Sequence, residues 1–258
     1  MRLKNRFLRG GLIAAFWLGV WTLAALAVGL PLLFPTPIGV LKRLIVLMGE
    51  PTFYLITAYS FGRVLIGILA AMLLGIALSF LTARFSIVRE TLHPLMTVIK
   101  STPVASFVVL AVLWMGAERV TSFVTFLIVL PVIWTNLDEG FANIDTQLDE
   151  VTRVYRFSPL RRLRVLILPS LRPYFVSACR TAFGLAFKAG IAAEIIVLPK
   201  IAIGTEIYEA KLYIEAEDMF AWTLVVVLVT LLLEFAFSRL LRRLDPPAMQ
   251  KEARDAEI

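Results

Sequence analysis

The chain has 258 residues, of which 59% are hydrophobic, and its mean hydropathy is +0.84. A soluble domain has roughly 45–50% apolar residues, and apolar runs recur here along the whole length, so a soluble domain with one membrane anchor does not fit. The net charge of +7 does not indicate nucleic-acid binding, because the basic residues cluster between apolar runs, as in the inner loops of membrane proteins. One cysteine and one histidine allow neither an intrachain disulfide nor a metal or redox motif.

The apolar runs predict six membrane-spanning segments, at about residues 11–34, 54–83, 92–116, 120–141, 171–198 and 219–241. The first follows four basic residues, a layout shared with signal peptides, and Ala25-Leu26-Ala27 resembles a cleavage site. Because the apolar run continues past that site and is too long for a signal peptide, we expect a retained span that ends at Pro31, Pro35 and Pro37. Residues 1–10 form a cytoplasmic segment in this interpretation, 11–244 the transmembrane domain, and 245–258 a cytoplasmic tail.

The segments between and within these spans carry the polar signals. Lys42–Glu50 is expected to be a short surface segment, and residues 200–218 an acidic amphipathic one with a helix starting at Gly204-Thr205. The third span is expected to be interrupted at Pro94 and Pro103, and a turn at residues 117–119 should follow it. The fifth span is less hydrophobic than the others, because it contains Arg180, Lys188 and Glu194.

The distribution of Lys and Arg predicts the orientation of the spans. If the N-terminus is inside, seventeen of the 26 basic residues lie in inner segments, five lie in outer segments, and the remaining four lie within spans. Inner loops of membrane proteins are enriched in Lys and Arg. Both termini and the basic segment at residues 149–169 are therefore expected to be cytoplasmic.

Residues 149–169 are the longest polar interruption in the second half of the chain, and they predict two short helices. The segment begins with Asp149 and Glu150 and breaks at Ser158-Pro159. Serine is a favoured N-cap, and proline at the first helical position loses no hydrogen bond that the helix would use, so a second helix is expected to start there. Leu168-Pro169 is expected to close it. The result would be a compact knob at the membrane surface, suited to binding another protein.

This knob resembles the cytoplasmic coupling loop of ATP-binding-cassette (ABC) importer permeases. Glu150-Val151-Thr152 stands where that family has an acidic residue followed by two small ones, and Leu166-Ile167-Leu168-Pro169 follows at the expected distance. Arg156 occupies the position where the family has glycine. The turn is therefore expected to be made by Phe157-Ser158-Pro159 instead.

The resemblance extends from Pro35 to about Leu244 and is closest to the nitrate, sulfonate and taurine branch. It includes Ser60–Val64 with Gly67, the Lys100–Pro103 stretch and Ala192-Ala193-Glu194. It implies an all-α integral membrane fold of the type I importer (MetI-like) architecture, with six transmembrane helices and a cytoplasmic coupling helix. The residues implied to form the ATPase-coupling loop are Asp149, Glu150, Thr152, Arg153, Arg156, Ser158, Pro159, Leu168 and Pro169.

The resemblance also implies the partners. They are two ABC ATPase subunits on the knobs, a second permease copy (as a homodimer), an extracytoplasmic solute-binding protein and the lipid of a bacterial plasma membrane, with no nucleic acid. The ATPase must be another chain, because a phosphate-binding loop needs G-x-x-x-x-G-K-[ST] and no Gly-Lys pair occurs here. ATP and Mg²⁺ would bind to that partner, while this chain would carry no cofactor and catalyse no reaction.

Charged residues within the fifth span are candidates for the translocation pathway. Ser177, Thr181, Gly184 and Lys188 share one helical face by their spacing. A charge within the membrane is costly unless it is paired or hydrated. Lys188 therefore either faces the pathway, where it meets an anionic solute, or forms a structural ion pair with Glu194 or another buried acid.

The third span offers a second set of pathway candidates. Lys100, Ser101 and Thr102 precede Pro103, and interrupted backbone in a membrane is tolerated only where it is buried in protein or lines a wet cavity. The alternative is a proline kink at which the hydroxyls satisfy the backbone. Glu194 is either part of a gate or a polar helix end, and Arg63, near the outer end of its span, is long enough to reach the interface.

Two other classes of function remain as alternatives. An ATP-independent secondary transporter or channel often has an inverted repeat, and no convincing repeat is seen in the sequence. A membrane-embedded enzyme needs clustered catalytic groups within its spans, and none is present. The cargo is a small organic or inorganic solute; the intramembrane bases are compatible with an anion, while the same branch also carries neutral and aromatic solutes.

Overall fold

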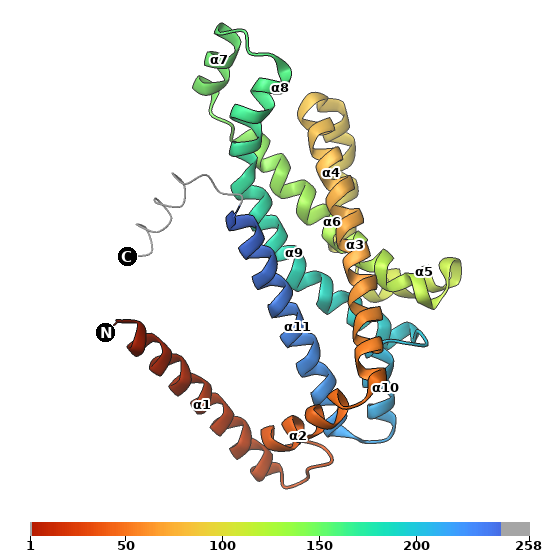
Figure 1. Ribbon diagram of the computed structural model, residues 1–258. Coiled ribbons are helices and arrows are strands. Elements are labelled where there is room, and N and C mark those ends of the chain that lie inside the picture. The colour runs from red at the N-terminus through yellow and green to blue at the C-terminus, as the bar shows by residue number, and fades with distance from the viewer. Residues whose placement is uncertain (1, 244–258) are drawn as a thin grey trace. The chain divides into compact units, whose positions relative to one another are not determined.

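The computed structural model describes the backbone of residues 2–243 and the side chains of residues 9–239, and the regular structure in that range is all helical (Figure 1). The all-α prediction is confirmed. The predicted tail, residues 245–258, lies outside the described residues. The chain divides into two compact units: Met1–Ser60 with Leu198–Val227, and Phe61–Val197 with Leu228–Ile258.

The first unit contains α1 (Arg2–Val28), α2 (Pro37–Met48), the beginning of α3 (Pro51–Arg84), α10 (Ile203–Leu212) and the beginning of α11 (Ala216–Arg243). The first apolar helix ends earlier than residue 34, because Gly29 adopts a left-handed φ of +67°. The next helix starts where Thr36 accepts a hydrogen bond on its Oγ1 from the Gly39 amide at 3.2 Å. Pro37 occupies its first turn, where the missing N–H costs nothing.

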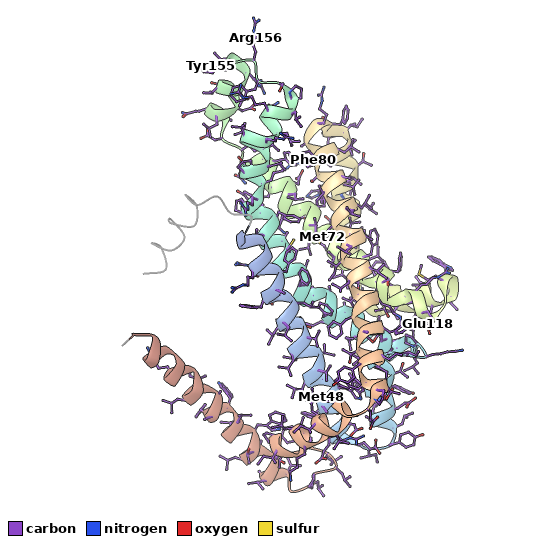
Figure 2. All side chains as sticks on the ribbon, in the orientation of Figure 1. Met48, Met72, Phe80, Glu118, Tyr155 and Arg156 are labelled. Atoms are coloured by element: carbon purple, nitrogen blue, oxygen red, sulfur yellow. The ribbon has the colours of Figure 1, made fainter. Side chains whose placement is uncertain are left out.

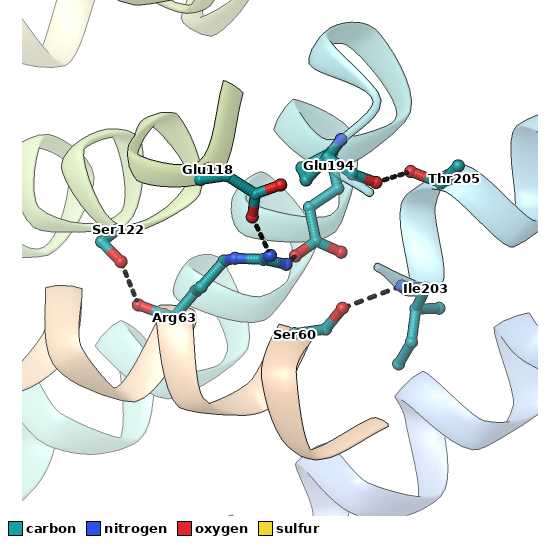
Figure 3. A network of polar contacts seen from close by, with 8 residues as sticks. Ser60, Arg63, Glu118, Ser122, Glu194, Ile203 and Thr205 are labelled. Atoms are coloured by element: carbon teal, nitrogen blue, oxygen red, sulfur yellow. Dashed lines mark hydrogen bonds and ion pairs between the residues drawn. The ribbon is translucent and has the colours of Figure 1, made fainter. Parts of the chain in front are cut away.

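Aromatic and polar contacts join the ends of this first unit. Phe53 of α3 stacks on Trp222 of α11, with ring centroids 5.2 Å apart. Arg43 of α2 forms an ion pair with Asp218 of α11. The Ser60 hydroxyl accepts a hydrogen bond from the Ile203 amide at 2.8 Å, which holds the start of α10 against α3 (Figure 3).

The second unit contains the rest of α3, α4 (Ser86–Ser101), α5 (Val104–Met115), α6 (Ala117–Ala142), α7 (Thr146–Val154), α8 (Pro159–Arg162), η1 (Leu163–Ile167), α9 (Leu168–Val197) and the end of α11. Its core forms where α6 packs along α9. A Cβ added at Gly190 would lie 2.6 Å from Cγ2 of Val64 and 3.1 Å from Oγ1 of Thr125. Only glycine therefore permits the close crossing of α3, α6 and α9.

Among the described residues, four helical segments are long and apolar enough to cross a membrane: Arg9–Val28, Pro51–Arg84, Ala117–Ala142 and Ala216–Arg239. The pair Ser86–Ser101 and Val104–Met115 would add a fifth span if the two count as one. The fifth predicted span corresponds to α9, which has 30 residues but carries the charges already noted in that segment. The chain is thus an all-helical protein with several candidate spans.

The third predicted span is broken at one proline only. The axes of α4 and α5 differ by 100° across Thr102 and Pro103, where Thr102 is extended with ψ 131°. Pro94 lies inside α4 and does not interrupt it, so that part of the prediction is wrong. A proline inside a helix removes one donor, and the helix tolerates this when the rest of its hydrogen bonds remain.

The helix that follows the knob starts earlier than expected. We expected Leu168-Pro169 to close the knob, but these residues instead begin α9, so the chain is helical from Pro159 to Val197. Leu163–Ile167, between α8 and α9, form a π-helical turn in which the Leu168 amide donates to the Leu163 carbonyl. Pro169 lies within this continuous helix directly after the π-helical turn, and local π adjustments of this kind let a helix accommodate the missing N–H of a proline.

Candidate functional site

One carboxylate holds the knob (residues 149–169) together. Asp149 of α7 accepts on Oδ1 a hydrogen bond from Nε of Arg162 in α8, at 2.9 Å. Its Oδ2 pairs with Nη2 of Arg153, one turn further along α7, also at 2.9 Å. The Asp149 side chain is only 17% exposed, so water screens these contacts partly. Asp149 therefore fixes the angle between the two short helices.

Arg156 makes the turn between these helices. Its φ is +49°, and its amide donates to the Arg153 carbonyl at 3.0 Å, while the Phe157 amide donates to the Thr152 carbonyl at 2.9 Å. This is the pattern of a helix C-terminus capped by a left-handed residue, where glycine is usual. The expectation that Phe157-Ser158-Pro159 would turn the chain is thus wrong, because the last carbonyls of α7 obtain their donors only if the chain reverses at Arg156.

Ser158 and Pro159 start the second helix, as predicted. The Ser158 hydroxyl accepts a hydrogen bond from the Arg161 amide at 3.4 Å, and Pro159 is the first helical residue. The Arg161 guanidinium lies 4.2 Å from the centre of the Phe157 ring. The Thr152 side chain is buried in the knob and donates to the Asp149 carbonyl at 2.7 Å. The knob is therefore a small, internally bonded body.

The outer surface of the knob is apolar with a charged edge. Val154 is 78% exposed and Tyr155 73%, and Tyr155 and Arg156 lie at the tip of this part of the chain (Figure 2). Glu150 is exposed and has no ion-pair partner among the described residues. Leu168 and Pro169 are exposed at the base of the knob. Exposed apolar side chains on a rigid frame are typical of a docking surface.

A second polar group lies deep in the same unit. Arg63 of α3 pairs through Nη1 with Oε1 of Glu194 in α9 at 3.3 Å, and through Nη2 with Glu118 in α6 (Figure 3). Glu194 is fully buried and Arg63 nearly so. The Ser122 hydroxyl donates to the Arg63 carbonyl at 2.8 Å. The three charged residues tie three helices together, and Arg63 does not extend to the surface as a snorkelling residue would.

The candidate face of α9 points away from the described core. Ser177, Thr181 and Lys188 are exposed, and a Cβ at Gly184 would meet nothing within 4 Å. Lys188 forms no ion pair with any described residue, and Glu194 is paired with Arg63 instead. Lys188 and Glu194 therefore do not form an ion pair within this chain. The alternative, in which the Lys188 face meets another chain or a solute, remains.

The polar side chains of the Lys100–Pro103 stretch make two kinds of contact, within α4 and across to α6. The Ser101 hydroxyl donates to the Thr97 carbonyl at 2.9 Å, and the Thr102 hydroxyl donates to the Val98 carbonyl at 2.8 Å. Both hydroxyls bond to carbonyls of the last turn of α4, and the Val98 carbonyl also accepts the Thr102 amide, so these bonds do not satisfy the carbonyls that the break itself leaves free. Lys100 differs, since its Nζ donates across to Oγ1 of Thr135 in α6 at 2.7 Å.

Comparison with known proteins decides the family. Residues 64–249, most of the chain, match the family described as the binding-protein-dependent transport system inner membrane component. The chain belongs to this family. It is 25% identical over 233 residues to the taurine transport system permease protein TauC of Escherichia coli (strain K12), which covers 88% of this chain and 84% of TauC.

Two further relatives agree with this assignment. The nitrate import permease protein NrtB of a Synechocystis species is 27% identical over 256 residues, covering 95% of this chain and 92% of NrtB. A chain of the MetNI methionine ABC transporter, in an inward-facing conformation, superposes with a TM-score of 0.62 at 17% identity, covering 76% of this chain and 99% of that one. The MetI-like fold predicted from the sequence is thus supported.

The protein is therefore the permease component of an ABC importer, a multi-pass inner-membrane subunit whose ATPase is a separate chain. Glu194 and Arg63 were both named from the sequence, but their pairing was not predicted, nor was Glu118 as the second carboxylate on Arg63. The acidic residue in the short polar stretch after Gly116 was the available sequence signal. The ion pair of Arg89 with Asp138 at 2.8 Å was not predicted either.

One carboxyl group of the permease lies outside the candidate spans and has a shifted pKa. Burial raises the pKa of Glu206 in α10, and the negative charges of Glu209, Asp218 and Glu50 raise it further. Asp218 itself is paired with Arg43, and this hydrogen-bonded pairing raises the pKa of the Arg43 guanidinium. In the first unit, Arg43 thus pairs with Asp218, while burial and neighbouring carboxylates favour the protonated form of Glu206.

Proposed function

We propose that the knob is the point at which the permease receives the motion of its ATPase. The side chains of Val151, Val154 and Leu160 are exposed around the frame that Asp149 fixes. A groove in a partner that covered these apolar side chains would gain the free energy of their burial. The exposed carboxylate of Glu150 would set the orientation of docking through a charge on the partner.

The observation that carries this proposal is the helical path from the knob into the core. The chain is helical from Pro159 to Val197, and α9 alone, with 30 residues, is about 45 Å long at 1.5 Å per residue. Near its far end lies Glu194, which pairs with Arg63 of α3. A displacement of the knob would move this stiff element as a whole, and the Arg63 cluster would transmit the movement to α3 and α6.

The helices of the second unit also bear on the number of spans and on which side of the membrane the termini lie. We infer six spans, with the bent α4–α5 pair as one and α9 as another, because the buried Glu194 of α9 is paired with Arg63, and Arg180 and Lys188 lie at exposed positions. The excess of inner basic residues places both termini and the knob in the cytoplasm. The exposed face of α9 with Lys188 would meet a second permease copy across the pathway.

The pathway proposed for the solute includes residues of two kinds. Lys100, Thr181 and Lys188 present polar groups on exposed faces and would contact the solute, whereas Ser101 and Thr102 would shape the bend beside it. Glu194 is buried within the subunit and would act as part of a gate. The solute is a small organic or inorganic molecule delivered by an extracytoplasmic binding protein, and ATP with Mg²⁺ would bind to two partner ATPases, with none on this chain.

The charge reversal Glu150→Lys tests the coupling role. Glu150 is exposed and has no ion-pair partner among the described residues, so the substitution should leave membrane insertion and folding unchanged. In the complete complex reconstituted into vesicles, we expect loss of most of the ATP hydrolysis that the loaded binding protein stimulates, together with loss of uptake.

The matched control is Glu90→Lys, which reverses an exposed acid on α4, outside the knob. It should hydrolyse ATP and import solute as the wild type does. Uptake at the wild-type rate by the Glu150→Lys complex would count against the knob as the coupling site. Equal losses in both variants would indicate a general effect of charge at the inner surface.

A further inference from the structure

A cavity of ≈340 Å³ lies between α4 and α6 of the second unit. Small-molecule sites in proteins start at about 300 Å³, so this space suits a small solute. One wall comes from residues of α4 at helical spacing, including Arg89, His93 and Lys100, and the opposite wall from residues of α6 around Trp134 and Asp138. The lining is therefore rich in charged and polar groups, unlike the apolar packing of α6 against α9.

The charges of the lining do not all neutralise one another. Arg89 and Asp138 form an ion pair, with Nη2 and Oδ2 at 2.8 Å and Nε also bonded to Oδ2 at 3.0 Å. The Asp138 carboxylate accepts a further hydrogen bond from the Thr82 hydroxyl at 3.3 Å. These contacts satisfy one cation and one anion. Lys100 and Glu139 are the charged lining residues that remain.

Lys100 retains unused hydrogen-bond donors. An ammonium group has three N–H donors, and among the described residues the Lys100 Nζ donates only to Oγ1 of Thr135, at 2.7 Å. That hydroxyl already donates to the Pro131 carbonyl at 2.6 Å, so it presents a lone pair to the lysine. A neutral hydroxyl cannot neutralise the positive charge, and Lys100 therefore offers a binding position for an anionic group.

Glu139 supplies the opposite charge from the α6 wall. It is exposed, it lines the cavity, and it forms no ion pair with any described residue. Glu139 follows Thr135 by four residues, and such pairs on a helix have Cβ atoms about 5–6 Å apart. The cation held at Thr135 and the carboxylate of Glu139 thus lie about one helical turn apart without neutralising each other.

A buried donor adds to this picture. Trp134 lines the cavity with 2% of its surface exposed, and its Nε1–H has no acceptor among the described residues. An indole N–H buried without a partner is unfavourable by about 1–3 kcal/mol in general. Because this nitrogen is itself enclosed, only a shift of the indole would bring it to an acceptor oxygen on a molecule in the cavity.

We propose that the cavity between α4 and α6 is a binding site for a small zwitterionic solute, with its anionic group at Lys100 and its ammonium group at Glu139. Because the lining as a whole is balanced in charge, a ligand with both charges leaves neither Lys100 nor Glu139 unpaired. A simple anion would satisfy only Lys100, and a simple cation only Glu139. The role of this site in transport rests on the proposed function. Its binding of a zwitterion does not, and can be tested separately.

Calorimetric titration of the full-length permease in lipid nanodiscs, without ATP or partner chains, tests the site. The probes are 2-aminoethanesulfonate and β-alanine as zwitterions, ethanesulfonate as an anion and ethylamine as a cation. We expect both zwitterions to bind at least about tenfold more tightly than either singly charged probe, since each charged contact adds a charge-assisted hydrogen bond.

Substitutions assign the two ends of the ligand. Lys100→Met should weaken zwitterion binding about tenfold or more, while Lys100→Arg, which keeps the charge, should retain most of the affinity. Glu139→Gln should remove the preference for 2-aminoethanesulfonate over ethanesulfonate. The controls are Lys42→Met on α2 and Glu90→Gln on α4, both exposed positions outside the cavity, and both should bind as the wild type does.

Two results would overturn the proposal. One is the absence of binding of every probe to the wild type, and the other is unchanged affinity in both Lys100→Met and Glu139→Gln. Neither result touches the coupling role, which is measured separately through the ATP hydrolysis of the Glu150→Lys complex. Conversely, wild-type coupling in Glu150→Lys together with selective zwitterion binding would reject the coupling role and retain this site.

Discussion

The permease contains two ion-pair networks that differ in location and in reach along the chain. In the knob, Asp149 and Arg162 are separated by 13 positions, and Arg153 is 72% exposed. In the core, Arg63 and Glu194 are separated by 131 positions, and Glu194 is fully buried. Exposed pairs contribute little to stability, whereas a buried pair broken on one side is costly. The first network therefore sets a local shape, while the second holds helices together.

The largest effect is expected at the buried network. Glu194→Gln removes the buried carboxylate that faces Arg63, whereas the other acid that pairs with this guanidinium, Glu118, is 54% exposed. Breaking a buried pair from one side typically costs about 3–5 kcal/mol. We expect a clearly lower midpoint of thermal unfolding in detergent, together with a lower yield of the assembled complex.

The double substitution Arg63→Met with Glu194→Leu separates charge from packing. If the cost of Glu194→Gln comes from a cation left unpaired, removing both charges should restore much of the lost stability. If the double variant is as unstable as the single one, the contribution of the cluster is its shape, and the contrast with the knob weakens.

The knob should show the opposite balance of effects. Asp149→Asn removes the ion pair with Arg162 that joins α7 to α8 and the pair with Arg153 within α7, yet Arg153 and Arg162 are 72% and 40% exposed. The loss of stability should stay near or below about 1 kcal/mol. Uptake by the reconstituted complex should nevertheless fall strongly, because the angle between the two helices is no longer fixed. Unfolding midpoints measured beside uptake rates check this, and a large drop of both would remove the distinction between the two networks.

Arg156→Gly tests the left-handed backbone conformation at the turn of the knob. A non-glycine residue in the left-handed region costs roughly 1–2 kcal/mol, and glycine loses part of this gain through its greater freedom in the unfolded chain. With φ at +49°, the substitution should stabilise the turn by about half a kcal/mol. Slower hydrogen exchange of the Arg156 and Phe157 amides is the expected readout. Faster exchange would mean that the arginine side chain itself holds the turn.

Features of the permease that depend on local sequence could be predicted, whereas those that depend on contacts between distant segments could not. The start of α8 at Ser158 and Pro159 and the extent of α6 are local properties, so capping preferences and hydrophobic periodicity indicate them well. The turn at Arg156 was mispredicted, because the hydrogen bonds that require it outweigh the conformational preference of the residue. The pairing of Glu194 with Arg63 depends on how three helices cross at Gly190, and no local pattern specifies that crossing.

Glu206 offers the smallest effect and shows what burial does to a carboxyl group without a close cation. Its pKa is raised, mainly by burial, so the folded state holds the proton more tightly than the unfolded chain, whose value is near 4.5. The resulting stabilisation is fully present below that value and is lost as the pH rises through the raised folded-state pKa. Glu206→Gln should therefore unfold at a slightly higher temperature than the wild type near neutral pH, and this advantage should shrink on acidification toward about pH 4.5. Unfolding midpoints across this range measure it, and an advantage that grows toward acidic pH would show that the folded state stabilises the carboxylate form of Glu206 instead.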